Sequence, residues 1–230
     1  MNITKTIVIP ARYASKRFPG KALALIEEIP MIIRVYKRLE SLKKKLDCKI
    51  WVVTDDKRIY DVVDKYGYNC KMTKEHKSGT DRVYEFSTCI SSDIYINVQG
   101  DEPLVNPEDV EKVIFAKEHN MGCIVGSMAF INIGEMQDET IVKVKINEDG
   151  FLTDITRKPI STIYRQCGIY AYTKQELKQF YYSCVNEVEG IELTRWCNEI
   201  KMVRIKGSHA VDMPEDLEKI KIAIQRGERL

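Results

Sequence analysis

The stretch ITKTIVIPARYASKRFPGK, residues 3–21, joins a short segment rich in β-branched residues to a loop rich in cations. Residues 3–9 have the composition of a buried strand, and the loop over residues 10–21 carries Pro19 and Gly20. In an open parallel sheet, ligands bind beyond the carboxyl ends of the strands. The loop that follows this strand is therefore the first place to look for a binding site.

An alternation of apolar strands and amphipathic helices continues from this stretch to about residue 120. Further strands are predicted over 50–53, 68–72 and 94–98, with helices over 31–46, 58–66, 81–90 and 107–119. Short strands separated by turns follow over 124–130, 141–146, 151–156 and 162–172, before helix, strand and helix over 174–182, 202–205 and 214–226. This order predicts an α/β fold, in which a mostly parallel sheet has helices on both faces and an antiparallel β subdomain.

The composition is that of an ordinary globular protein and excludes several functional classes. The 230 residues are 44% hydrophobic and 30% charged, which excludes a disordered chain. A net charge of only +2 argues against a protein that mainly binds nucleic acid or an anionic membrane. No apolar run approaches the roughly 18 residues of a membrane span. Seven scattered cysteines without a CxxC pair predict reduced thiols in the cytoplasm and argue against a zinc site.

The loop over residues 10–21 has the chemistry of a polyphosphate site. Its polar side chains are those of Arg12, Ser15, Lys16, Arg17 and Lys21. Arginine and lysine donors neutralise several phosphate oxygens at once. The spacing matches neither GxxxxGK[ST] nor GxGxxG, so the folds tied to those motifs are not supported. A solvated basic loop is the alternative that the spacing leaves open.

Acidic side chains follow two other predicted strands. Asp101 and Glu102 come directly after the strand over 94–98, and Asp212 follows the strand over 202–205. Carboxylates in such positions can hold Mg²⁺ against substrate phosphates. Each has a structural alternative, because Asp101 and Glu102 could cap a turn and Asp212 could cap the last helix.

Five segments, taken in order, give the chain a resemblance to a known family. They are PARYAS-x-R-x-PGK (10–21), SGTDR (78–82), NVQGDEP (97–103), GIYAY (168–172) and D-x-PEDLE (212–218). On these segments the chain resembles the 3-deoxy-manno-octulosonate (Kdo) cytidylyltransferases over nearly its whole length. That family transfers CMP from CTP to an eight-carbon 2-keto acid sugar with Mg²⁺, and releases pyrophosphate. It serves lipopolysaccharide and capsule polysaccharide biosynthesis.

The resemblance implies a Rossmann-like nucleotidyltransferase sheet and a single domain over residues 1–230. About 1–120 and 201–230 would form the nucleotide-binding core, and about 121–200 the acceptor-binding and dimerisation subdomain. Its implied partners are CTP, a small acidic acceptor and a second copy of the chain in a cytoplasmic homodimer. Val142, Val144 and Ile146 alternate with lysines, which suits an exposed sheet edge or such an interface.

The resemblance also implies a role for individual residues. The catalytic residues would be Lys21, Arg17, Asp101 and Asp212, the two aspartates being the ligands of Mg²⁺. The CTP contacts would be Arg12, Ser15, Arg17, Lys21, Ser78, Arg82 and Gln99. The acid-sugar contacts would be Gln99, Arg157, Gln166, Tyr170 and Glu192.

The chain departs from the family pattern in the acceptor half. Gln166 stands where the family has His, Leu193 stands where it has Gln, and the stretch over 157–165 is shorter and lacks a Trp-containing segment. We therefore expect transfer of CMP to Kdo or a close variant. The alternatives are transfer to another ulosonic acid or to a phosphorylated or phosphonate compound, and a nucleotide-binding homologue without catalytic activity.

Overall fold

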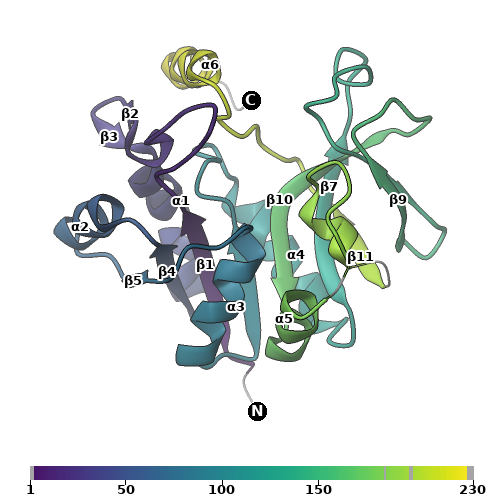
Figure 1. The fold of residues 1–230 in the computed structure, drawn as a ribbon, viewed down its shortest axis with the longest axis horizontal. Helices are drawn as coiled ribbons and strands as arrows, with labels where there is room; N and C mark the ends of the chain where they lie inside the picture. Colours follow the sequence, from purple (N-terminus) through teal and green to yellow (C-terminus); the bar gives the residue numbers. More distant parts are fainter. Residues whose placement is uncertain (1–2, 184, 197–198, 227–230) are drawn as a thin grey trace.

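A mixed β-sheet forms the centre of the computed structural model, which describes residues 3–183, 185–196 and 199–226 (Figure 1). Along the sheet the strands run in the order β11-β7-β10-β6-β1-β4-β5, and β8 and β9 extend from β10. Their bounds are β1 Lys5–Ala11, β4 Cys48–Thr54, β5 Cys70–Met72, β6 Ile94–Val98, β7 Ile124–Phe130, β8 Lys143–Ile146, β9 Leu152–Thr156, β10 Tyr164–Tyr172 and β11 Ile200–Arg204.

Along the strand order from β11 to β5, most neighbouring strands are parallel. β1 pairs in parallel with β4 and β6, β4 with β5, and β11 with β7. β10 is antiparallel to both β6 and β7, and the β8–β9 hairpin continues from it. Strands such as β6 are buried at every position, as expected of a sheet covered on both faces. The predicted α/β fold is confirmed.

Two apolar cores separate the sheet from its helices. One core packs α1 (Met31–Lys45), α2 (Lys57–Lys65) and α4 (Pro107–Glu118) against one face, and the other packs α3 (Gly79–Cys89) and α5 (Lys174–Tyr181) against the opposite face. α1 shows why the helices form where they do: its apolar residues recur at helical spacing and are buried, while its lysines face outward.

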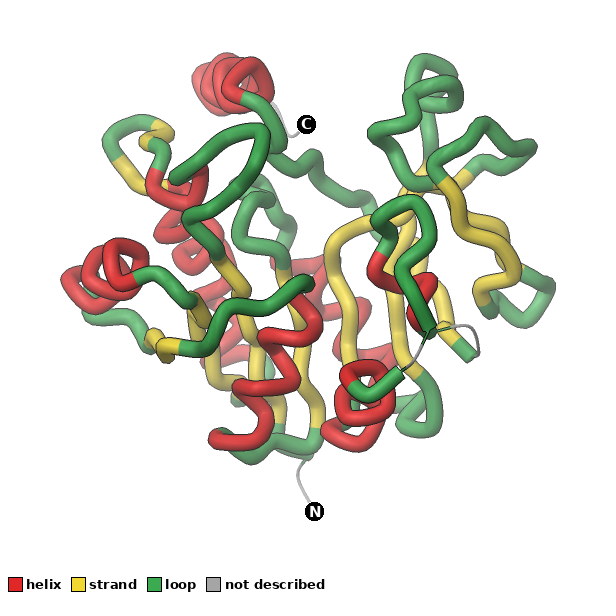
Figure 2. Tube along the Cα trace, in the orientation of Figure 1, coloured by secondary structure: helices red, strands yellow, loops and turns green. Residues whose placement is uncertain are grey.

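A third, smaller apolar cluster joins the C-terminal helix to the N-terminal part of the chain. α6 (Pro214–Gln225) contributes Leu217 and Ile220, which pack with Val211 and with Ile26 of the hairpin β2 (Leu25–Ile26) and β3 (Ile29–Pro30). The loops after β1 and β6 and the segment before α6 therefore meet at one end of the sheet (Figure 2).

The region over residues 121–200 does not stand apart from the sheet. β7 and β10 pair within the central sheet, while the β8–β9 hairpin projects from it. Val144 of β8 is fully buried, and so it does not belong to an exposed edge. The functional division near residue 120 stays a prediction.

Two observations bear on cellular context. The cysteines that the structure describes are all free thiols. In the described part of the chain, no helix combines the length and apolar character that crossing a membrane requires.

Candidate active site

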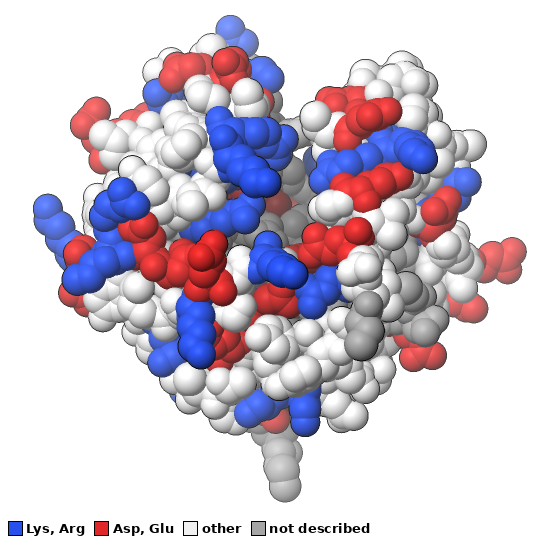
Figure 3. All heavy atoms as spheres, viewed as in Figure 1, with Lys and Arg blue, Asp and Glu red and all other residues white. Residues whose placement is uncertain are grey.

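A cavity of about 550 Å³ opens at the carboxyl ends of β1 and β6. Its walls come from the loop after β1, the segment before α3, the loop after β6, the region around Glu192, and Asp212. Lys and Arg side chains gather around a hollow near the middle of this face (Figure 3). Segments far apart in sequence thus form one polar site where a parallel sheet places its ligands.

The loop after β1 is held in a tight turn by Tyr13 and Gly20. The backbone oxygen of Tyr13 accepts from the amides of Ser15 and Gly20, both at 2.8 Å. Gly20 has φ 73°, and a Cβ there would lie 3.0 Å from Cζ of Tyr13. The Arg58 guanidinium lies 3.3 Å from the centroid of the Tyr13 ring. This turn directs the 3₁₀ helix η1 (Lys21–Leu23) so that Lys21 enters the cavity.

Lys21 lies between two aspartates that are far apart in sequence. Its Nζ is 2.5 Å from Oδ2 of Asp101, 3.4 Å from Oδ1 of Asp212 and 2.9 Å from the backbone oxygen of Val211. Nη2 of Arg17 is 2.9 Å from Oδ2 of Asp212. The fold therefore brings together the four residues that the sequence predicts to be catalytic.

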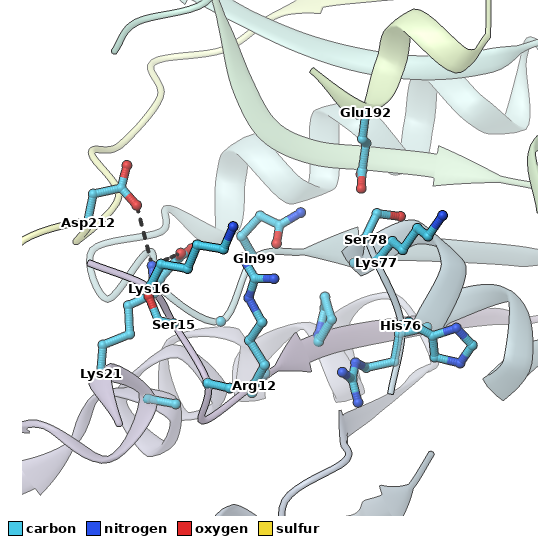
Figure 4. A pocket seen from close by; sticks show the side chains of 18 of the residues that line it. Arg12, Ser15, Lys16, Lys21, His76, Lys77, Ser78, Gln99, Glu192 and Asp212 are labelled. Carbon is cyan, nitrogen blue, oxygen red and sulfur yellow. Dashed lines mark hydrogen bonds and ion pairs between the residues drawn. The ribbon is translucent and has the colours of Figure 1, made fainter. Parts of the chain in front are cut away.

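The two aspartates fit Mg²⁺ as that ion is held in phosphate chemistry. Both carboxylates already converge on one cationic group, the Lys21 ammonium (Figure 4). Mg²⁺ usually takes one or two carboxylates together with substrate phosphates and water. Over residues 3–183, 185–196 and 199–226, no group of three or more His, Cys, Asp or Glu side chains is placed to hold a metal. The donor set thus suits an ion that is shared with a nucleotide.

Arg12, Ser15 and Lys16 supply further polar groups from the loop after β1. All three line the cavity, and Ser15 is buried. Figure 4 shows Arg12 and Lys16 extending from this wall toward Gln99. Among the described residues, neither cation has a carboxylate within ion-pair distance, so both charges are available to a ligand.

The opposite wall is the N-terminal turn of α3. Ser78 caps this helix, accepting from the amide of Asp81 at 3.1 Å. The Arg82 guanidinium is buried and donates to Asp55 at 2.8 Å and to Thr73 at 2.6 Å. Ser78 and Arg82 both line the cavity, with Arg82 tying the ends of β4 and β5 to α3.

Glu192, in the 3₁₀ helix η2 (Glu192–Arg195), faces this wall from the region over residues 121–200. Its Oε1 accepts from the Thr80 hydroxyl at 2.5 Å, and Figure 4 shows it opposite Ser78. Burial raises the pKa of Glu192, and the hydroxyls of Thr80 and Ser78 counter part of that effect. Gln99 lines the cavity between this wall and the cationic loop.

Three of the predicted acid-sugar contacts lie outside the cavity walls. Arg157 donates to the backbone oxygens of Glu189 at 2.9 Å and Thr140 at 2.7 Å. Gln166 donates to the hydroxyl of Tyr170, and burial raises the pKa of that tyrosine. These side chains bind other parts of the protein and are not brought to the cavity.

Sequence reasoning did not single out several residues that line the cavity. Lys77 and His76 precede Ser78, and Glu187 lies near Glu192. Adjacency to the SGTDR segment is the one sequence feature that points to Lys77.

Glu102 turns away from the aspartates. This residue is 5% exposed, its carboxylate accepts from the Ser208 hydroxyl at 2.6 Å, and burial raises the pKa of Glu102 to about 7.

Comparison with known proteins extends the picture to the whole chain. A 3-deoxy-manno-octulosonate cytidylyltransferase of Escherichia coli is 35% identical, with 94% of each chain covered. An 8-amino-3,8-dideoxy-manno-octulosonate cytidylyltransferase of Shewanella frigidimarina is 34% identical, with 95% of this chain and 98% of that one covered.

Solved structures agree with these sequence relatives. A CMP:2-keto-3-deoxy-manno-octonic acid synthetase complexed with CTP superposes with a TM-score of 0.89 at 33% identity, covering 97% of this chain and 99% of that one. A UDP-glucose pyrophosphorylase, at 13% identity and a TM-score of 0.72, shares the fold. The family described as Cytidylyltransferase matches residues 6–222. The chain therefore belongs to the cytidylyltransferase family, together with the 3-deoxy-manno-octulosonate cytidylyltransferases that it resembles in sequence and in fold.

Proposed function

We propose that the chain transfers the CMP group of CTP to the anomeric hydroxyl of a 2-keto acid sugar, Kdo or a close variant. The hydroxyl oxygen forms a bond to the α-phosphorus, the bond from that phosphorus to the bridging oxygen breaks, and pyrophosphate leaves. The hydroxyl proton passes to solvent. The observation that carries this proposal is the convergence of Lys21, Asp101 and Asp212 in one polar cavity.

The cationic loop would bind the triphosphate of CTP. Arg12 and Lys16 extend into the cavity without carboxylate partners among the described residues, and Ser15 adds a hydroxyl. Lys21 and Arg17 would stabilise the charge that develops on the phosphoryl oxygens during transfer. Ser78, Arg82 and Gln99 would contact the nucleotide from the other walls.

Asp101 and Asp212 would hold Mg²⁺ beside these phosphates. When bound, the ion supplies positive charge to the phosphate oxygens and lowers the pKa of a coordinated hydroxyl. Lys21 contacts both aspartates, so it lies where it can neutralise them before the nucleotide arrives. His76 lines the cavity, but its Nε2 lies 2.5 Å from Oε2 of Glu85, so the ring is hydrogen-bonded to that carboxylate.

Gln99 and Glu192 are the acceptor contacts that the cavity best supports. An acid-sugar contact with Arg157, Gln166 or Tyr170 requires an acceptor that extends beyond this cavity. Leu193 is fully buried in an apolar core and offers the acceptor no hydrogen bond. A missing polar partner changes acceptor preference by about 1–3 kcal/mol. Such a change favours a close variant over Kdo itself, and an 8-amino sugar acid belongs in any substrate panel.

We also propose a homodimer that works in the cytoplasm. Three exposed apolar residues lie near the end of β7 and the start of β10. They are Phe130, Ile133 and Ile163, which are 56%, 88% and 58% exposed. Exposed apolar groups of this size mark interaction surfaces. The free thiols are compatible with a reducing compartment.

Pyrophosphate release tests the proposed reaction. The purified chain is supplied with Mg²⁺ and CTP, with UTP and ATP as controls, and with Kdo, 8-amino-Kdo, other ulosonic acids and phosphonates as acceptors. We expect release that depends on CTP and on a 2-keto acid sugar. Release with a phosphonate alone would reassign the acceptor, and CTP binding without turnover of any acid would indicate a non-catalytic homologue.

A further inference from the structure

An ion pair beside Glu192 joins η2 to the N-terminal turn of α3. Nη1 of Arg195 lies 3.0 Å from Oδ1 and 2.9 Å from Oδ2 of Asp81, and Nη2 donates to the backbone oxygen of Phe180 at 3.1 Å. The Asp81 side chain is 7% exposed and that of Arg195 is 11% exposed. Because the pair is largely removed from solvent, breaking it costs far more than breaking a surface ion pair.

The same turn of α3 carries the cavity residues of the nucleotide side. The Ser78 hydroxyl donates to Oδ2 of Asp81 at 2.9 Å, so one carboxylate contacts both Ser78 and Arg195. One residue earlier, Thr80 donates to Glu192 at 2.5 Å. The two ends of η2 are thus fixed to α3 by adjacent residues, Thr80 at Glu192 and Asp81 at Arg195.

η2 has little support of its own. It is a four-residue 3₁₀ helix, and its N-terminus has no side-chain cap. Short 3₁₀ helices have poor hydrogen-bond geometry, so the position of Glu192 depends on contacts with the rest of the protein. Leu193 packs in an apolar core, and Arg195 adds polar contacts to Asp81, to Phe180 and through its own backbone oxygen, which accepts from Ser183 at 3.0 Å.

We propose that Arg195 is a positioning residue that holds Glu192 toward the acceptor and couples the acceptor site to the nucleotide site through Asp81 and Ser78. This inference rests on the proposed function. Binding of CTP against Ser78 orders the turn of α3, and the Asp81–Arg195 pair passes that order to η2. Acceptor binding then costs less conformational entropy after CTP is bound than before.

Steady-state kinetics test the positioning role. Arg195→Met should raise the KM for the acid acceptor about tenfold and leave the Kd of CTP, measured without acceptor, within about twofold, whereas Arg195→Lys, which keeps the charge, should recover part of the loss. The double variant Asp81→Asn/Arg195→Met leaves no buried charge unpaired and guards against misfolding. A rise in the Kd of CTP without acceptor equal to the rise in the acceptor KM would overturn the proposal.

Arg34→Met is the matched control. Arg34 also contacts one carboxylate, Glu27, and one backbone oxygen, that of Ile26, both at 3.0 Å, but it lies on α1 and does not line the cavity. We expect it to lower stability without changing the ratio of the acceptor KM to the Kd of CTP measured without acceptor. A shift of that ratio equal to the shift in Arg195→Met would show that general destabilisation is the cause.

Hydrogen exchange separates the coupling from the reaction. In the unaltered chain, CTP should increase amide protection at residues 78–81 and at 191–196, and in Arg195→Met only at 78–81. Protection confined to 78–81 in the unaltered chain would overturn the coupling while leaving the proposed function intact. Transmitted protection together with no turnover of any acid would overturn the function and leave the coupling standing.

Discussion

The Lys21 ammonium contacts two carboxylates and a backbone oxygen, so removing any one partner leaves it with others. Its side chain is 11% exposed, whereas those of Asp101 and Asp212 are 26% and 39% exposed. The aspartates therefore remain open to a ligand from the cavity, while the lysine is held in place beneath them. On the proposed function, the two aspartates contribute more to binding and reaction than to folding.

Asp101→Asn should fold normally and lose activity by orders of magnitude. The amide keeps the size of the side chain but removes the charge that a divalent ion requires. Pyrophosphate release and thermal unfolding, measured on the same preparation, check the two halves of this statement. Asp154→Asn, an exposed aspartate of β9, is the control and should match the unaltered chain. Near-full turnover in Asp101→Asn would remove Asp101 from the metal site.

Glu192→Gln should weaken acceptor binding and should stabilise the folded chain at high pH. The pKa of Glu192 is raised above its ordinary value of 4.5, chiefly by burial. The folded chain therefore binds more protons at this site than the unfolded chain, and the free energy of unfolding falls as pH rises from about 4.5 through the raised pKa. Gln does not ionise, so the variant escapes that fall.

Urea unfolding at about pH 5 and about pH 8 checks this expectation. The free energy of unfolding of Glu192→Gln minus that of the unaltered chain should be larger at the higher pH than at the lower one. The KM of the variant for the acid should rise. Glu148→Gln, at the exposed turn between β8 and β9, should show neither change. A stability difference that does not vary with pH would contradict the titration of Glu192.

The sequence predicted the cationic and acidic clusters better than the acceptor contacts. Lys21, Asp101 and Asp212 each follow a strand, and parallel strands bring their carboxyl ends to one edge. Gln166 and Tyr170 lie within a strand, where the face that a side chain occupies depends on register. The register of β10 shifts between Cys167 and Tyr170, and no local pattern indicates such a shift.

Among the structural elements, the loop after β1 depends most on one backbone conformation. Gly20 is in the left-handed region and packs against Tyr13, whose ring the Arg58 guanidinium also covers. The loop is therefore braced before any nucleotide binds. Preorganised cations bind phosphate without the entropy cost of ordering a flexible loop.

Gly20→Ala should weaken CTP binding beyond its effect on stability. Alanine in this conformation costs about 1 kcal/mol, and its Cβ would also press on the Tyr13 ring. Gly67→Ala provides a close control, because Gly67 has the same φ of 73° and no atom within 4 Å of the added Cβ. We expect both variants to lose stability in thermal unfolding, Gly20→Ala more because of the Tyr13 contact, and only Gly20→Ala to raise the KM for CTP. Equal KM values would show that the loop adapts.

The helices and buried strands could be predicted because their patterns are local. α1 was expected over 31–46 and spans Met31–Lys45, and the strand expected over 94–98 is β6. The pairing of β11 with β7 could not be predicted from a local pattern, since it joins residues that are far apart in sequence. The β2–β3 hairpin was also missed, because two-residue strands carry no periodicity.

In the whole molecule, one group of exposed apolar residues lies where β7 ends and β10 begins. The sequence pointed to Val142, Val144 and Ile146 as an interface, but Val144 packs inside the protein. Phe130, Ile133 and Ile163 are exposed instead, and the amide of Ile131 donates to the backbone oxygen of Ile163 at 2.9 Å. This bond places the end of β7 beside the start of β10, and we propose that a second copy binds there.

Ile133→Asp should convert the proposed dimer to a monomer. A charge at the centre of an apolar interface loses its hydration without gaining a partner. Sedimentation velocity at several protein concentrations measures the change. Phe115→Asp, which alters another exposed aromatic residue on α4, should leave the assembly unchanged. If the unaltered chain sediments as a monomer, this surface has no role in self-association.

The position of Asp212 after the last strand has a consequence for biosynthesis. β11 pairs with β7, and Asp212 meets Lys21 across nearly the full length of the polypeptide. A nascent chain emerging from the ribosome displays its cationic loop first and acquires the second aspartate, with the helix that packs against that loop, only 191 residues after Lys21. On the proposed assignment, incomplete products would be catalytically silent, and consumption of the cellular nucleotide would begin only once this late segment has docked.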